Sequence, residues 1–87
     1  MYVILVYDFG EKRVAKILKL CRKYLNWIQN SVFEGELSEV QLKELLHEAK
    51  KFMKDEEDSL IVFKSRNNKW LDKEIHGLEK MSTDVFL

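Results

Sequence analysis

The chain has 87 residues, of which 46% are hydrophobic, and this is enough for one small domain with a core of its own. A single cysteine excludes an internal disulfide, no Cys/His cluster suggests zinc, and no stretch reaches the ~20 apolar residues of a membrane span, so we expect a cytoplasmic protein. The formal net charge is zero, but residues 1–30 carry six basic against two acidic side chains (+4), and residues 31–62 carry four against nine (−5).

Two short apolar segments, residues 2–7 (YVILVY) and residues 60–63 (LIVF), predict buried strands. Both are apolar on their two alternating sides, whereas a sheet that helices cover on one face only is usually polar on the other. One interpretation is that the second face meets another copy of the chain. The other is that these residues are apolar merely because strands are, and we favour the homodimer.

Residues 11–24 predict an amphipathic helix. Its apolar side chains recur at three- and four-residue spacing and are expected to face the core: Val14, Ile17, Leu18, Cys21 and Leu25. Its other face is basic: Lys12, Arg13, Lys16, Lys19, Arg22 and Lys23. Such a stripe suits contact with the phosphate backbone of a nucleic acid, and the alternative is a solvated helix surface.

The middle of the chain predicts a strand and a second helix. Residues 26–37 favour a strand that ends at Gly35, although a strand pair in this segment is also compatible with the sequence. Ser38 and Gln41 fit a capping box at the start of the helix. Its apolar stripe is expected to be buried: Leu42, Leu45, Leu46, Ala49, Phe52 and Met53. The acidic residues 55–58 are expected to form a solvated turn.

The last part of the chain, residues 66–87, predicts a turn at 66–69, a strand at 70–76 and an apolar tail end. The pattern therefore counts as β-α-β-α-β-β, or as β-α-β-β-α-β if residues 26–37 hold two strands. Both orders indicate an α+β protein with an antiparallel sheet and two helices on one face.

Asp8 is the acidic side chain at the end of the first apolar strand. One carboxylate is a poor magnesium site, but two copies related by a two-fold axis could supply both carboxylates. The alternative role is a cap for the following helix. We expect His47 and His76 at the surface and Cys21 in the core. Two aromatic side chains could stack on bases, but packing is favoured for both: Trp27 and Phe33.

Three stretches together resemble the CRISPR-associated protein 2 family: YVILVYD, EKRVAKIL, and WIQNSVFEG with its Q-x-S-V-F-E spacing. The resemblance covers essentially the whole chain. It implies a ferredoxin-like βαββαβ domain in residues 1–78 and a homodimer formed sheet to sheet. The tail, residues 79–87, would add a strand to the partner. The motif residues would have structural or dimer roles: Gln29, Ser31 and Phe33.

The resemblance also implies a function in the acquisition of CRISPR spacers. Asp8 would be the catalytic residue and the Mg²⁺ ligand of an endoribonuclease or endonuclease. The dimer would serve as a DNA-binding adaptor for the CRISPR integrase, and single-stranded RNA is a further candidate ligand. The expected nucleic-acid contacts are Lys12, Arg13, Lys16, Lys19 and Lys23. The alternative is a toxin-type ribonuclease of the virulence-associated protein D group, which shares the fold.

Overall fold

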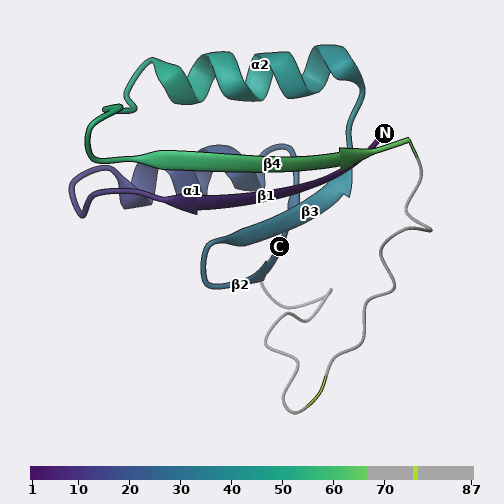
Figure 1. Cartoon of the computed structure of the whole chain (residues 1–87), viewed down its shortest axis with the longest axis horizontal. Coiled ribbons are helices and arrows are strands. Elements are labelled where there is room, and N and C mark those ends of the chain that lie inside the picture. Colours follow the sequence, from purple (N-terminus) through teal and green to yellow (C-terminus); the bar gives the residue numbers. More distant parts are fainter. Residues whose placement is uncertain (67–75, 77–87) are drawn as a thin grey trace.

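The computed structural model of the chain describes residues 1–66 and residue 76 (Figure 1). Its elements are β1 (Tyr2–Asp8), α1 (Val14–Arg22), β2 (Asn26–Gln29), β3 (Val32–Glu36), α2 (Glu39–Lys50) and β4 (Ser59–Ser65). The strands form one sheet in the order β2-β3-β1-β4, and neighbouring strands are antiparallel. This is the ferredoxin-like βαββαβ arrangement, which confirms the expected fold class.

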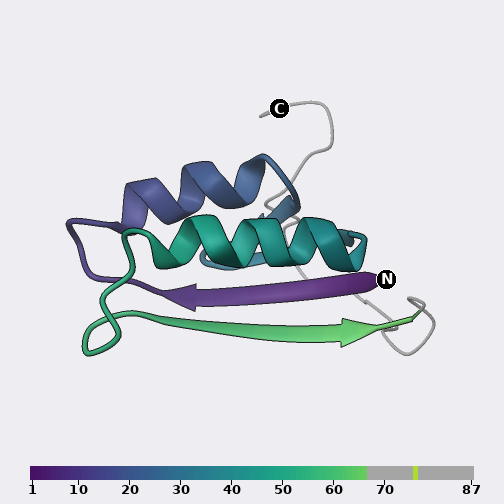
Figure 2. The same ribbon diagram turned by 90° about the horizontal axis from the view of Figure 1, so that it is seen from above.

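Both helices cover the same face of the sheet, as Figures 1 and 2 show from two directions. The alternation predicted for the first strand is confirmed, because Val3, Leu5 and Tyr7 are buried while the residues between them are only partly buried. The helices and β3 complete the core with side chains that are also buried: Ile17, Leu20, Cys21, Phe33, Leu42, Leu45 and Ala49. Within residues 1–66, the opposite face of the sheet, here called the outer face, carries no helix.

The segment of residues 26–37 is a hairpin of two strands, so the order β-α-β-α-β-β is wrong. Asn30 turns the chain between β2 and β3 with a positive φ of 46°, a conformation that asparagine tolerates better than most residues. Gly35 does not end the strand, because β3 continues to Glu36 and Gly35 pairs with Val3. A Cβ at Gly35 would lie 3.2 Å from Leu25 Cδ2, so this site favours the smallest residue.

Helix α1 begins at Val14, three residues later than the predicted start at residue 11. The preceding residues form a turn in which the Arg13 amide donates to the Gly10 carbonyl at 2.9 Å. Val14 was expected in the core but is 39% exposed, and Leu20 is buried in addition to Ile17. The predicted capping box of α2 is confirmed at Ser38.

Several predictions lie outside the described residues. These are the turn at 66–69 apart from Arg66, the strand at 70–76 apart from the exposed His76, and the exchanged tail strand at 79–87. The domain boundary at residue 78 stays a prediction for the same reason. Within residues 1–66 and 76, neither helix has the length and apolar character needed to cross a membrane.

Candidate functional site

Asp8 is exposed at the last position of β1, opposite Ser59 at the start of β4. Because side chains alternate along a strand, Asp8 shares the outer face with Ile4 and Val6. It does not cap the following helix: the N-cap position of α1 is Arg13, and no side chain hydrogen-bonds there. The structure therefore leaves Asp8 as an open carboxylate at one end of the outer face.

The outer face next to Asp8 is apolar. Ile4 lies opposite Phe63, and Val6 lies opposite Ile61, so the four side chains form one patch across β1 and β4. Phe63 is 48% exposed and Ile61 is 51% exposed. Among the described residues, no helix covers this second face of the sheet, and its apolar character agrees with the sequence prediction.

A polar pair borders this patch on the side of β3. The Tyr2 hydroxyl donates a hydrogen bond to Glu34 Oε1, and Glu34 is a buried residue of β3. Burial, together with the hydrogen bond to Glu34, raises the pKa of the Tyr2 phenol. Tyr2 is therefore a neutral hydrogen-bond donor at any physiological pH.

The described part of one chain holds no complete cluster of metal ligands. Over residues 1–66 and 76, no three His, Cys, Asp or Glu side chains gather closely enough to hold a metal ion. Magnesium is nevertheless commonly held by one or two carboxylates, with waters and substrate phosphates as its other ligands. The exposed carboxylate of Asp8 fits one of these positions.

A basic surface lies on the helical side of the molecule. Its exposed side chains come mainly from α1 and its flanks: Lys12, Lys16, Lys19 and Lys23. Three of them border a shallow cavity of about 260 Å³ together with Glu48 of α2 and with Lys51 and Phe52, which follow α2. The Lys51 Nζ forms an ion pair with Glu48 Oε2 at 3.0 Å. The Lys16 Nζ lies 5.8 Å from the centre of the Phe52 ring. Sequence reasoning missed Lys51, because it belongs to a segment whose overall charge is acidic.

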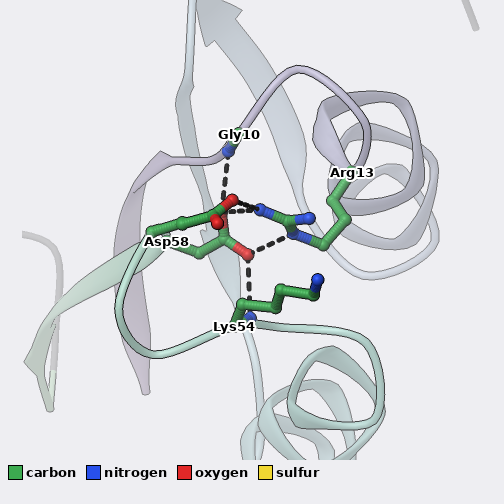
Figure 3. Close-up of polar contacts among 5 residues, drawn as sticks. Gly10, Arg13, Lys54 and Asp58 are labelled. Atoms are coloured by element: carbon green, nitrogen blue, oxygen red, sulfur yellow. Dashed lines mark hydrogen bonds and ion pairs between the residues drawn. The ribbon is translucent and has the colours of Figure 1, made fainter.

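Arg13 does not belong to this basic surface, and its contact with nucleic acid stays a prediction. Arg13 is only 7% exposed, and its guanidinium is held by Asp58 (Nε–Oδ2, 2.6 Å; Figure 3). It also pairs with Glu57 (Nη2–Oε1, 2.7 Å). The expectation of a fully solvated turn at 55–58 is wrong, since the Asp58 side chain has no exposed surface. Hydrogen bonds to Asp58 and Glu57 raise the pKa of Arg13. The hydrogen bond from Arg13 holds the pKa of Asp58 below its usual range.

The motif residues around the β2–β3 hairpin have different environments. Phe33 is fully buried and stacks on Tyr7 with ring centres 6.1 Å apart, so it packs in the core and is not open to bases. Gln29 is exposed, and Ser31 is partly buried with its carbonyl accepting from the Tyr7 amide at 3.1 Å. The Trp27 indole donates to the Asn30 carbonyl at 2.9 Å and closes the turn.

Two further predicted assignments are confirmed. His47 is exposed on α2, as the surface role predicted for it requires. Cys21 is fully buried, and this burial raises the pKa of its thiol to about 12. Cys21 is therefore a small core residue and not a nucleophile.

Comparison with known proteins gives a consistent result. The family model described as CRISPR associated protein Cas2 matches residues 1–73. The CRISPR-associated endoribonuclease Cas2 of Fusobacterium nucleatum is 50% identical over 100% of this chain and 87% of its own length. The protein of the same name from Thermotoga maritima is 50% identical over 92% of both chains. A solved structure described as a crystal structure of Cas2 has a TM-score of 0.84 and 41% identity, over 100% of this chain and 98% of that one.

Proposed function

Because the chain belongs to the Cas2 family of CRISPR-associated proteins, we propose that it is a magnesium-dependent endoribonuclease that works as a homodimer. Relatives at 50% identity bear the name CRISPR-associated endoribonuclease Cas2. Membership in this family decides against the toxin-type ribonuclease of the virulence-associated protein D group. The observation that carries the proposal is the place of Asp8, which is exposed at the end of β1 on the apolar outer face.

The outer face supports the proposal of a homodimer. An apolar patch that lacks a covering helix is unfavourable in water, and a second copy of the same face can cover it in a closed two-fold arrangement. Asp8 lies at one end of β1 and shares this face with Ile4 and Val6. A two-fold axis near that end would bring both Asp8 carboxylates to one substrate, as a shared site requires.

Asp8 and Lys12 would have different roles at such a site. Magnesium, when bound, activates a water molecule and neutralises phosphate charge during phosphodiester hydrolysis. Each Asp8 carboxylate would hold and orient the cation by its charge. Lys12 lies exposed in the loop that follows Asp8, and it would attract the nucleic-acid backbone toward the site.

Replacing Asp8 by asparagine tests this proposal. The substitution keeps the size of the side chain but removes its charge, so magnesium-dependent cleavage of single-stranded RNA should fall at least a hundredfold, by analogy with roughly 10²–10⁴ for a positioned catalytic group. The matched control is Glu11→Gln, which removes one exposed carboxylate from the same loop. The dimer should persist in both variants. Full cleavage by the Asp8→Asn variant would refute the proposal.

A second function is supported by the basic surface. We propose that the dimer binds DNA through its lysines as an adaptor for the CRISPR integrase. Lys16, Lys19 and Lys23 have no acidic partner in an ion pair within the described part of the chain, so their charges are available to phosphates. Such contacts give affinity without reading the base sequence.

The double variant Lys16→Glu with Lys19→Glu tests the adaptor. Each lost phosphate contact reduces the slope of log affinity against log salt by about 0.9 for duplex DNA, so two lysines per chain should lower it by about 2 or more. Lys43→Glu provides the control, because Lys43 is exposed on α2 outside the cavity-lining residues. Gel-shift titrations at several salt concentrations measure both quantities. An unchanged affinity at low salt would contradict the assignment.

A further inference from the structure

A buried ion pair ties together the two loops at the end of the sheet that carries Asp8. One loop joins β1 to α1 and contributes Gly10 and Arg13; the other joins α2 to β4 and contributes Lys54 and Asp58 (Figure 3). The Asp58 Oδ1 accepts from the Gly10 amide at 2.7 Å, and Oδ2 accepts from Arg13 Nε at 2.6 Å and from the Lys54 amide at 2.9 Å. A further bond from Arg13 Nη2 reaches Oδ1 at 3.1 Å.

These bonds use the acceptor capacity of the carboxylate fully. An ionised carboxylate accepts about four hydrogen bonds, and Asp58 accepts four from groups on both loops. Its side chain has no exposed surface, so water does not compete for these positions. Hydrogen bonds to a charged acceptor are shorter and stronger than neutral ones. Asp58 therefore fixes the backbone of the first loop at Gly10, two residues after Asp8.

The same loop is also fixed from its other side. A Cβ at Gly10 would lie 2.5 Å from Arg13 Nη2, so the guanidinium occupies the space that a side chain would need. The Arg13 amide donates to the Gly10 carbonyl at 2.9 Å, which closes the turn. Phe9, between Asp8 and Gly10, is buried and packs edge-on against Tyr7 and Phe52. The residues after Asp8 thus have little freedom, although Asp8 itself is exposed.

We propose that Asp58 is a positioning residue for the cation site at Asp8, acting through the Gly10 amide and the Arg13 side chain. It does not touch the substrate, because it is enclosed by the two loops. Arg13 belongs to the same network, where its guanidinium fills the space beside Gly10 and neutralises the charge of Asp58. The proposal rests on the magnesium site proposed above for Asp8. The buried Arg13–Asp58 pair would hold the exposed Asp8 carboxylate in a geometry that suits a hard cation.

The experiment compares the full-length wild type with Asp58→Asn by nuclear magnetic resonance, with magnesium chloride as the probe. Exchange of the Gly10 amide should accelerate about tenfold or more in the variant, because a charged acceptor has been replaced by a neutral one. Magnesium titration, followed by the Asp8 amide shift, should give an affinity roughly tenfold weaker, the lower end of the loss seen when a group that orients a metal ligand is removed. Glu56→Gln, in the same turn and exposed, should leave both values unchanged.

A second variant protects the test against simple unfolding. Gly10→Ala should displace the Arg13 guanidinium while leaving Asp58 in place, and it should weaken magnesium binding in the same direction. Cleavage should be recovered at high magnesium in both variants but not in Asp8→Asn, which separates positioning from loss of folded protein. Wild-type exchange and magnesium affinity in folded Asp58→Asn would overturn the proposal. Magnesium binding by the wild type without cleavage would refute only the nuclease function.

Discussion

Replacing Phe63 by alanine should weaken the self-association of the chain, and the exposed fraction of the Phe63 side chain determines the expected loss of free energy. Complete burial of a phenylalanine side chain stabilises a protein by about 1.5–3 kcal/mol. Phe63 is 48% exposed, so the surface still open to a partner corresponds to roughly half of this value. A two-fold interface contains the residue twice, and the loss per dimer is therefore about 1.5–3 kcal/mol. The dissociation constant should rise about tenfold to a hundredfold.

Sedimentation equilibrium over a range of concentrations measures this constant. Val40→Ala provides the matched control, because Val40 is an apolar side chain with 65% exposure on α2, on the other side of the sheet. Ile61→Asp should have a larger effect than Phe63→Ala, since it places a charge inside the apolar patch. A wild type that stays monomeric at micromolar concentration, or a Phe63→Ala variant with an unchanged constant, would refute the covered outer face.

Three further predictions concern stability and reactivity. Ser38→Ala should lower the free energy of unfolding by about 1 kcal/mol, because the Gln41 amide loses its acceptor; an unchanged urea midpoint would contradict the cap. The bond from Arg13 lowers the pKa of Asp58, so its contribution to stability is full above pH of about 4 and is lost as the pH falls further. Acid unfolding should therefore be less steep in Asp58→Asn than in the wild type. The Cys21 thiol, with its pKa raised to about 12 by burial, should resist alkylation at pH near 8 until the protein is denatured, and rapid labelling of the folded protein would argue against its packing.

Local patterns predicted most of the elements correctly. The alternation in β1, the stripe that includes Ile17 and Cys21, and the capping box at Ser38 all depend on residues within a few positions of each other. Their physics acts over one or two turns of chain, so it can be read from a short window. The β2–β3 hairpin was harder, because its turn depends on one positive φ at Asn30 and on a register shift between Trp27 and Gln29.

The roles of the charged residues could not be predicted in the same way. Arg13 has the helical spacing of the basic stripe, and Asp58 belongs to an acidic run that looks solvated. Their pairing joins positions 45 residues apart, and no local pattern distinguishes Arg13 from Lys16. The family resemblance did predict the order of the elements and indicated Asp8 as a candidate site residue.

The sequence by itself determined the alternation of apolar residues, the helix start at Ser38 and the membership of a family, because each is encoded in neighbouring residues or in a motif. Only the tertiary structure decided which charges remain free. When β4 packs beside β1, the loop before it carries Asp58 to Gly10 and Arg13, and a buried carboxylate then requires hydrogen-bond donors from whatever lies nearby. Arg13 supplies two of these hydrogen bonds and is therefore buried, whereas the lysines of α1 and its flanks stay exposed.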